Sequence, residues 1–235
     1  MQGTLVNTVA IIIGGLLGVL LRKGIPNNYK ETIMQGLGLC VVMIGLMGAL
    51  KADNILIVIF SIVIGSIIGE ALKIEKRLNQ FGNSIEKLFG KSEGGVAKGF
   101  VTASLIYCVG AMAIVGALDS GLKGDHSTLY AKSVLDGISS IIFSSTLGIG
   151  VVLSAGAVFI YQGFIVISAS VVEPLLTEYV IELMSAIGGL LILGIGLSIL
   201  GIKKVNVANM LPAVFMPILF FILEPYFSNL VNRIF

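Results

Sequence analysis

The feature that most constrains this chain is a series of long apolar segments, separated by short polar ones, that continues from end to end. Most of them approach the roughly 20 residues that an α-helix needs to cross a bilayer. Only 12% of the residues are charged, whereas a soluble domain carries about a quarter. We therefore predict an all-α, polytopic transmembrane helix bundle that forms one domain over residues 1–235. The predicted spans are 4–21, 32–50, 54–72, 100–118, 134–153, 157–172, 179–200 and 207–226.

The span count rests on one division of the chain. The apolar stretch 134–172 is too long for a single membrane crossing. We divide it at 154–156, where serine, alanine and glycine follow one another. This division predicts eight spans, and a re-entrant segment here would leave seven.

Basic residues give the predicted orientation. All fifteen Lys and Arg lie outside these segments, and eleven fall on one side of the bundle against four on the other. Cytoplasmic loops of membrane proteins carry the excess of Lys and Arg. We therefore expect both termini outside and a cytoplasmic linker at 73–99, whose apolar residues recur at the spacing of an interfacial amphipathic helix.

Small residues predict close packing between helices. The chain has 30 glycines, and Gly14 with Gly18 and Gly65 with Gly69 form GxxxG pairs. Such pairs let helix backbones approach one another in lipid. They predict a compact bundle, and a GxxxG face could also support a homodimer.

An internal repeat is also indicated. Segments 37–50 and 105–118 align without a gap and share six residues, including Cys40 and Cys108. A third run, 184–200, resembles them loosely and is predicted to cross in the opposite direction. We expect repeat-like units 1–72 and 157–235, in opposed orientation, around a central unit 100–153, although glycine–aliphatic runs can also look alike by chance. Inverted repeats are typical of secondary transporters.

Polar side chains at membrane depth concentrate in the fifth predicted span. Asp136 lies near its start, and Ser139, Ser140 and Ser144 fall on or beside the same helical face. A buried charge in hydrocarbon costs roughly 2.5–3.5 kcal/mol on insertion scales. One interpretation is a solute or ion path with Asp136 as its charged group. The other is a helix-terminal acid with serine hydroxyls bonded back to the helix carbonyls.

Charged residues before this span predict an outer mouth. Lys132 precedes Asp136 by one helical turn, so the two can either pair or bind a substrate carboxylate. Asp119 and Asp125 occupy a glycine-broken loop that also holds the single histidine, His126. We read His126 as a solvated residue.

Three more polar residues could complete the path from neighbouring spans. They are Asn7 in the first span, Glu70 at the end of the third, and Asn209 at the start of the eighth. The alternative for Glu70 is a residue at the membrane interface. For the amides of Asn7, Asn209 and Gln162, interhelical hydrogen bonds are the simpler explanation.

Several functional classes are not supported. Neither cysteine lies at metal-ligand spacing from another ligand, so we expect no metal site and no cofactor. No nucleophile elbow, zinc-protease motif or phosphate-binding loop occurs, and we expect no enzyme. The net charge of +2 does not favour nucleic acid as a partner.

Short motifs across nearly the whole chain carry a family resemblance. They are Gly3–Asn7 followed by Gly14–Gly15, Ile68–Glu70, Val109–Gly116, Gly121–Asp125, Lys132–Gly137 and Leu211–Pro212. On these residues the chain resembles the YqgA-like family, bacterial multi-pass inner-membrane proteins of unknown function. The resemblance implies an inner-membrane location and assigns no substrate.

These observations lead to three functional hypotheses. The first is a secondary transporter or permease for a small solute or ion. The alternatives are a passive channel and a non-transporting membrane scaffold or sensor whose basic linker meets anionic lipid.

Overall fold

The structure is a computed structural model that describes residues 1–22, 27–89, 95–108 and 111–223. Within these residues the chain forms helices and no strand, which confirms the predicted all-α class. The predicted features at Lys23, Lys91 and 224–235 lie outside the described residues. The helices, in chain order, are α1 Gln2–Arg22, α2 Asn27–Ala49, α3 Ile55–Ala71, α4 Ile74–Phe89, α5 Val96–Cys108, α6 Ala111–Leu122, α7 Ser127–Leu147, α8 Gly150–Ile167, α9 Ala169–Val172, η1 Glu173–Leu175, α10 Glu178–Ile199, α11 Val207–Met210 and η2 Leu211–Phe215, followed by a helical segment 216–223.

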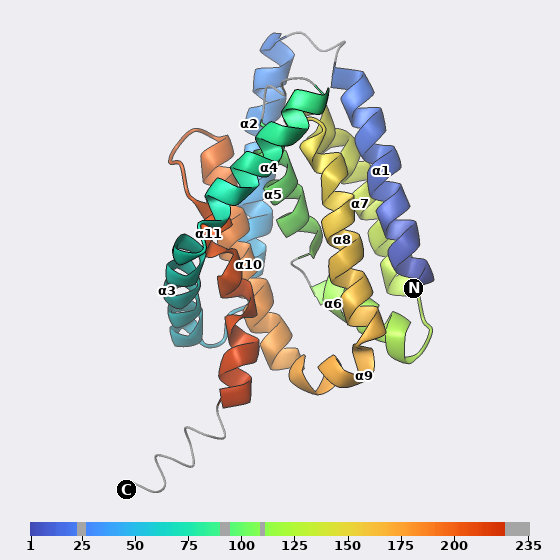
Figure 1. Ribbon diagram of the computed structural model, residues 1–235, viewed down its shortest axis with the longest axis vertical. Helices are drawn as coiled ribbons and strands as arrows, with labels where there is room; N and C mark the ends of the chain where they lie inside the picture. The colour runs from blue at the N-terminus through green and yellow to red at the C-terminus, as the bar shows by residue number, and fades with distance from the viewer. Residues whose placement is uncertain (23–26, 90–94, 109–110, 224–235) are drawn as a thin grey trace, which may run out of the picture.

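The helices stand side by side and reverse direction along the chain. In Figure 1, α1, α3, α7 and α10 run upward, whereas α2, α5 with α6, α8 and the segment 207–223 run downward. Four helices, α1, α2, α8 and α10, are long and apolar enough to cross a membrane, or six spans if two bent helix pairs each count as one. Both the count of eight and the opposed repeats remain predictions.

Glycines set the closest helix contacts. Gly14 and Gly18 of α1 pack against the backbone of α7, at Gly137 and Ile141, so tightly that no Cβ could fit. Gly65 and Gly69 of α3 pack in the same way on Ala213 and Asn209. Both GxxxG pairs therefore pack inside this chain, and the homodimer stays a prediction.

The sequence placed one helix boundary incorrectly. The predicted division at 154–156 lies inside α8, whereas the chain turns at Gly148, which has a φ of +78°. Glycine adopts this conformation at little cost and ends a helix there. Gly156, by contrast, faces open space within α8.

The linker helix α4 differs from the others. It crosses the upper half of the bundle obliquely in Figure 1, and its axis is bent by 52° from that of α3. Ile74 and Leu78 are half-buried, while Lys76 and Arg77 are exposed. This arrangement agrees with an amphipathic helix at a membrane surface.

Candidate functional site

Helix α7 turns a polar face into the bundle. Lys132, Asp136, Ser140 and Ser144 recur every four residues, and all four are buried. The opposite face is apolar and exposed, with Leu135 59% accessible. The sequence predicted this inward stripe. The reason for it is that lipid favours the apolar face and rejects the charged one.

A buried ion pair forms the centre of the stripe. The Lys132 ammonium lies 2.9 Å from the Asp136 carboxylate, and the two side chains are only 8% and 7% exposed. The Nδ2 group of Asn7, on α1, donates to Asp136 Oδ2 at 3.0 Å and to Gln162 Oε1, on α8, at 3.4 Å. Three helices therefore contribute to one polar cluster, which we call the Asp136 cluster: Asn7, Lys132, Asp136 and Gln162.

The Asp136 cluster has unused hydrogen-bonding capacity. Asn7 Oδ1, Gln162 Nε2 and the hydroxyl of the neighbouring stripe residue Ser144 are buried without a hydrogen-bond partner among the described residues. The orientation of Asn7 is fixed, because a carboxylate only accepts and so the amide nitrogen must face Asp136. Buried polar atoms usually have partners, and exceptions call for an explanation.

We expect the cluster to lie at membrane depth. Asp136 follows the first residue of α7 by nine positions, or about 14 Å at 1.5 Å per residue. Asn7 follows the first residue of α1 by five positions, or about 8 Å. Both helices begin at the lower end in Figure 1. In a hydrocarbon core about 30 Å thick, the cluster would occupy the half nearer that end.

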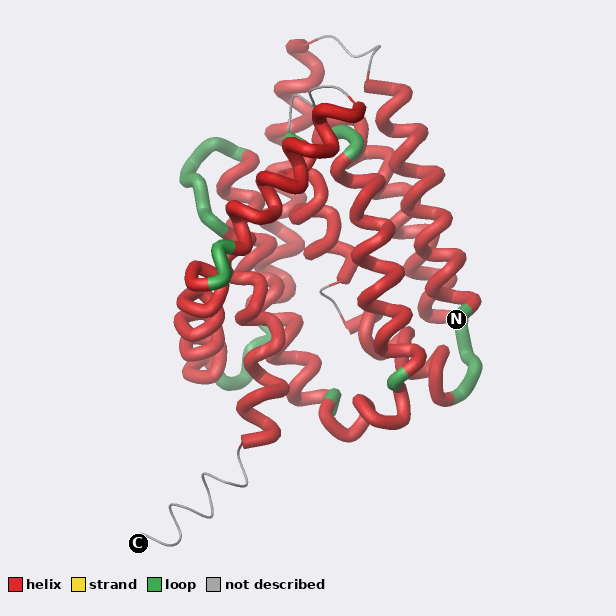
Figure 2. The backbone as a smooth tube through the Cα atoms, in the orientation of Figure 1, coloured by secondary structure: helices red, strands yellow, loops and turns green. Residues whose placement is uncertain are grey.

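Two described helices share the predicted span 100–118 beside this cluster. Helix α5 covers Val96–Cys108 and α6 covers Ala111–Leu122, and their axes differ in direction by 59°; both helices are drawn in Figure 2. In the last turn of α5, the Tyr107 hydroxyl lies 2.9 Å from the Ser140 hydroxyl. The predicted span 100–118 is therefore strongly bent, and its count as one crossing stays a prediction. Breaks at membrane depth persist only where they are buried in protein or line a cavity.

A cavity opens at the lower end, against α6. Its volume is about 970 Å³, and it lies between α6, the start of α10 and the α2–α3 connection. Five carboxylates and two lysines line it. The predicted mouth residue Asp119 is among them and pairs with Lys123 at 2.8 Å.

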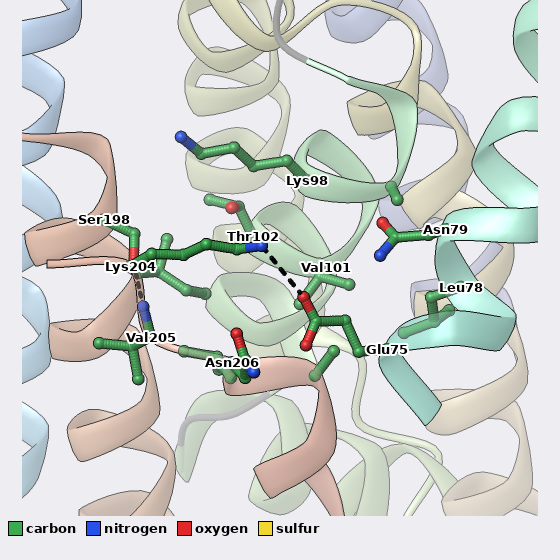
Figure 3. A pocket seen from close by; sticks show the side chains of 14 residues that line it. Glu75, Leu78, Asn79, Lys98, Val101, Thr102, Ser198, Lys204, Val205 and Asn206 are labelled. Atoms are coloured by element: carbon green, nitrogen blue, oxygen red, sulfur yellow. Dashed lines mark hydrogen bonds and ion pairs between the residues drawn. The ribbon is translucent and has the colours of Figure 1, made fainter. Parts of the chain in front are cut away.

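A second cavity opens toward the upper end, against α5. It measures about 440 Å³ and is lined by α4, α5, the end of α10 and the segment 204–208. In Figure 3, Glu75 and Lys204 point toward each other across it, 3.7 Å apart. Lys98 and Thr102 of α5 line the same cavity, and Lys98 has no carboxylate partner among the described residues.

The remaining predicted residues, Ser139, Glu70, Asn209 and Asp125, do not belong to the Asp136 cluster. Ser139 bonds back to the carbonyl of Asp136, as the simpler interpretation had it. Glu70 and Asn209 bond each other at the junction of α3 with α11, and no contact described joins them to the Asp136 cluster. Asp125 accepts from the Ser127 N–H at 2.9 Å where α7 begins, which lowers the pKa of its carboxyl.

Two participants were not among the predicted site residues. Gln162 was read only as an amide in need of a partner, and Tyr107 was hidden in an apolar run. A single polar group in such a run is the only signal that the sequence offers for either. No group of three or more metal-ligating side chains occurs within the described part of the chain.

Comparison with known proteins decides the family. The family described as "Protein of unknown function (DUF554)" matches residues 2–222. The chain belongs to the DUF554 family. This match agrees with the resemblance to the YqgA-like family that the motifs indicated.

Two curated relatives extend the DUF554 match. The "Uncharacterized membrane protein YdfK" of Bacillus subtilis (strain 168) is 36% identical over 221 residues, covering 92% of this chain and 94% of the relative. The "Uncharacterized protein YqgA" of Escherichia coli (strain K12) is 34% identical over 216 residues, covering 90% and 92%. No solved structure matches. With its long apolar helices, this DUF554 chain is a multi-pass integral membrane protein.

Proposed function

We propose that this DUF554 protein is a secondary transporter for a small solute, which binds beside the Asp136 cluster, where the axes of α5 and α6 diverge. One observation carries the proposal: the two halves of this bent span line cavities at opposite ends of the bundle. Val101 and Thr102 of α5 line the upper cavity, and Val115 and Leu118 of α6 line the lower one.

Both cavities also border the same central helix. Ile195 of α10 lines the upper cavity, and Ile181 and Ser185 line the lower one. A transporter must reach its site from each side in turn, and a broken span allows each half to move while the other stays packed. The arrangement of α5, α6 and α10 supports such an alternation around the bend between α5 and α6.

The buried ion pair has a role in this scheme. Placing Lys132 and Asp136 within hydrocarbon costs free energy, and ionisable residues inside a membrane are functional sites by default. In the closed form the two charges neutralise each other. A solute that enters from a cavity competes with one charge for the other, which couples binding to movement of α7 against α1.

The proposed location is the bacterial inner membrane, with the upper end in the cytoplasm. The described basic residues of α4 and of the 200–206 connection lie toward this end, including Lys203 and Lys204. The positive-inside rule assigns that end to the cytoplasm. The lower cavity would then open to the outside.

Access of water to the stripe tests the proposal without knowledge of the solute. In a Cys40→Ala, Cys108→Ala background, Ser140→Cys is exposed to a membrane-impermeant methanethiosulfonate reagent in right-side-out and inverted vesicles. We expect labelling from both sides. Ile138→Cys is the matched control, because Ile138 is 57% exposed on the apolar face of the same helix and should stay unlabelled. An unreactive Ser140→Cys in both vesicle types would contradict transport.

One observation favours a second function, a membrane scaffold without transport. Lys132 and Asp136 satisfy each other, and neither lines any of the five described cavities. In that case the cluster only joins α1, α7 and α8, and the basic face of α4 carries the interaction with anionic lipid. The labelling experiment separates the two functions.

A further inference from the structure

We infer that the transported solute is a small zwitterion that carries an ammonium and a carboxylate group, as an amino acid does. This inference rests on the proposed function and adds the class of substrate. It follows from three features of the site: its charge balance, its unused amide groups and the charges of its two cavities.

The charge balance excludes a solute of one sign. Lys132 and Asp136 form a neutral pair among buried surroundings. A cation that displaced Lys132 from Asp136 would leave the Lys132 ammonium without an opposite charge. An anion that displaced Asp136 from Lys132 would leave the Asp136 carboxylate without one. An uncompensated buried charge costs several kcal/mol. A zwitterion can take both partners at once, so every charge keeps an opposite one.

The unused amide groups match the same pair of charges. Asn7 Oδ1 is a buried acceptor on the residue that bonds Asp136, and it suits the N–H groups of an ammonium. Gln162 Nε2 is a buried donor, because Gln162 Oε1 already accepts from Asn7. This donor suits a carboxylate oxygen. The cluster thus offers the ammonium of the solute an anion and an acceptor, and it offers the carboxylate of the solute a cation and a donor.

The two cavities attract opposite ends of such a solute. The lower cavity holds five carboxylates against Lys51 and Lys123, so it favours an approaching ammonium group. In the upper cavity, Glu75 is already paired with Lys204, and Lys98 is left to attract a carboxylate. The lower entrance therefore orients the ammonium end of a zwitterion inward and the upper entrance its carboxylate end, whereas a simple cation or anion is attracted at only one entrance.

The test compares matched solutes on the full chain in detergent. The probes are the twenty protein amino acids, each with its α-methyl ester, which keeps the α-ammonium but loses the α-carboxylate, and its Nα-acetyl derivative, which keeps the α-carboxylate but loses the α-ammonium. Thermal unfolding is followed by circular dichroism, since a ligand that binds the folded state raises the melting temperature. We expect at least one amino acid to raise it saturably and both of its derivatives to bind at least tenfold more weakly.

Variants connect binding to the cluster. In Asp136→Asn, the amino acid should no longer raise the melting temperature. The double variant Lys132→Gln, Asp136→Asn should give the same result. It leaves no charge in the cluster, so it can be tested if the single variant does not fold. Ser145→Ala should keep the effect, because its hydroxyl bonds only the carbonyl of Ile142.

Each other outcome overturns the inference. A methyl ester that binds as well as its amino acid indicates a cationic solute, and an equally effective N-acetyl derivative indicates an anionic one. If no amino acid in the panel raises the melting temperature, the substrate class is wrong. Labelling of Ser140→Cys tests transport separately. If Ser140→Cys is labelled but no amino acid raises the melting temperature, the protein is a transporter of another substrate.

Discussion

The ammonium of Lys132 lies one helical turn from the carboxylate of Asp136 on α7, at 2.9 Å, with both side chains more than nine-tenths buried. A second pair, Lys123 with Asp119, has the same spacing and a similar distance of 2.8 Å, but the lysine side chain is 70% exposed. The two pairs differ in environment, in the order of acid and base along the helix, and in the extra bond that Asn7 donates to Asp136. Environment determines how much each contributes, because burial removes the screening that water provides.

Breaking the buried pair should destabilise the protein strongly. Asp136→Asn leaves the Lys132 ammonium uncompensated, and we expect the free energy of unfolding to fall by about 3–5 kcal/mol. Replacing both residues, as Lys132→Gln with Asp136→Asn, should restore most of the loss. Unfolding in mixed detergent micelles, followed by circular dichroism, measures both changes.

The exposed pair is the matched control for this prediction. Lys123→Ala should leave the unfolding free energy unchanged within error, since water screens that pair. Equal losses for Lys123→Ala and Asp136→Asn would show that burial does not distinguish the two pairs.

The contact between α1 and α7 should depend on the absence of a side chain at Gly14. A Cβ at this position would overlap the carbonyl oxygen of Gly137, so Gly14→Ala should cost about 1–3 kcal/mol by overpacking. Gly36→Ala on α2 is the control, because a Cβ there has no neighbour within 4 Å. It should be neutral or slightly stabilising, since alanine favours helix. Similar effects at both positions would contradict close α1–α7 packing.

Asn209 should hold the corner between α3 and α4. Its Oδ1 accepts from the Glu75 N–H at 2.7 Å, and its Nδ2 donates to Glu70. Asn209→Ala removes two partly buried hydrogen bonds, each worth about 0.5–1.5 kcal/mol. We expect faster hydrogen exchange at the first amides of α4. The exposed Asn206 provides the control, and Asn206→Ala should leave that exchange unchanged.

The orientation can be checked at the two ends of the bundle. In the background without Cys40 and Cys108, Lys98→Cys should react with an impermeant thiol reagent from the cytoplasmic side only. Lys123→Cys should react from the outside only, because the basic end faces the cytoplasm. The reverse pattern would place both termini inside.

Acidification should remove a small stabilising contribution at the start of α7. The Ser127 N–H holds the pKa of Asp125 below its ordinary value of 3.8. Because the folded pKa is depressed, the contribution is present above the unfolded pKa and is lost as pH falls through the folded pKa. Asp125→Asn should therefore have a lower melting temperature than the unmodified protein at pH 7. The difference between the two melting temperatures should shrink below about pH 4. A difference independent of pH would assign the effect to something other than this charge.

Much of the fold could be predicted from local properties of the sequence. The polar stripe of α7 was visible because Asp136, Ser140 and Ser144 recur at helical spacing within an apolar run. The boundary at Gly148 and the bend between α5 and α6 were not, because several glycines in these runs are equally able to end a helix. Which glycine takes a positive φ depends on what packs against it.

The sequence by itself determined that this chain is an all-α membrane protein, and which face of α7 lipid would reject. Composition and periodicity are properties of each segment alone, so they predict helices and their apolar faces without knowledge of the tertiary contacts. Only the tertiary structure decided that Asn7 bonds Asp136 across 129 positions, that Gln162 joins them, and that Glu70 with Asn209 lies elsewhere. Many glycine and aliphatic faces could pack on one another with similar free energies. The choice among them, and so the partners of each buried polar group, is made by the packing of the whole bundle.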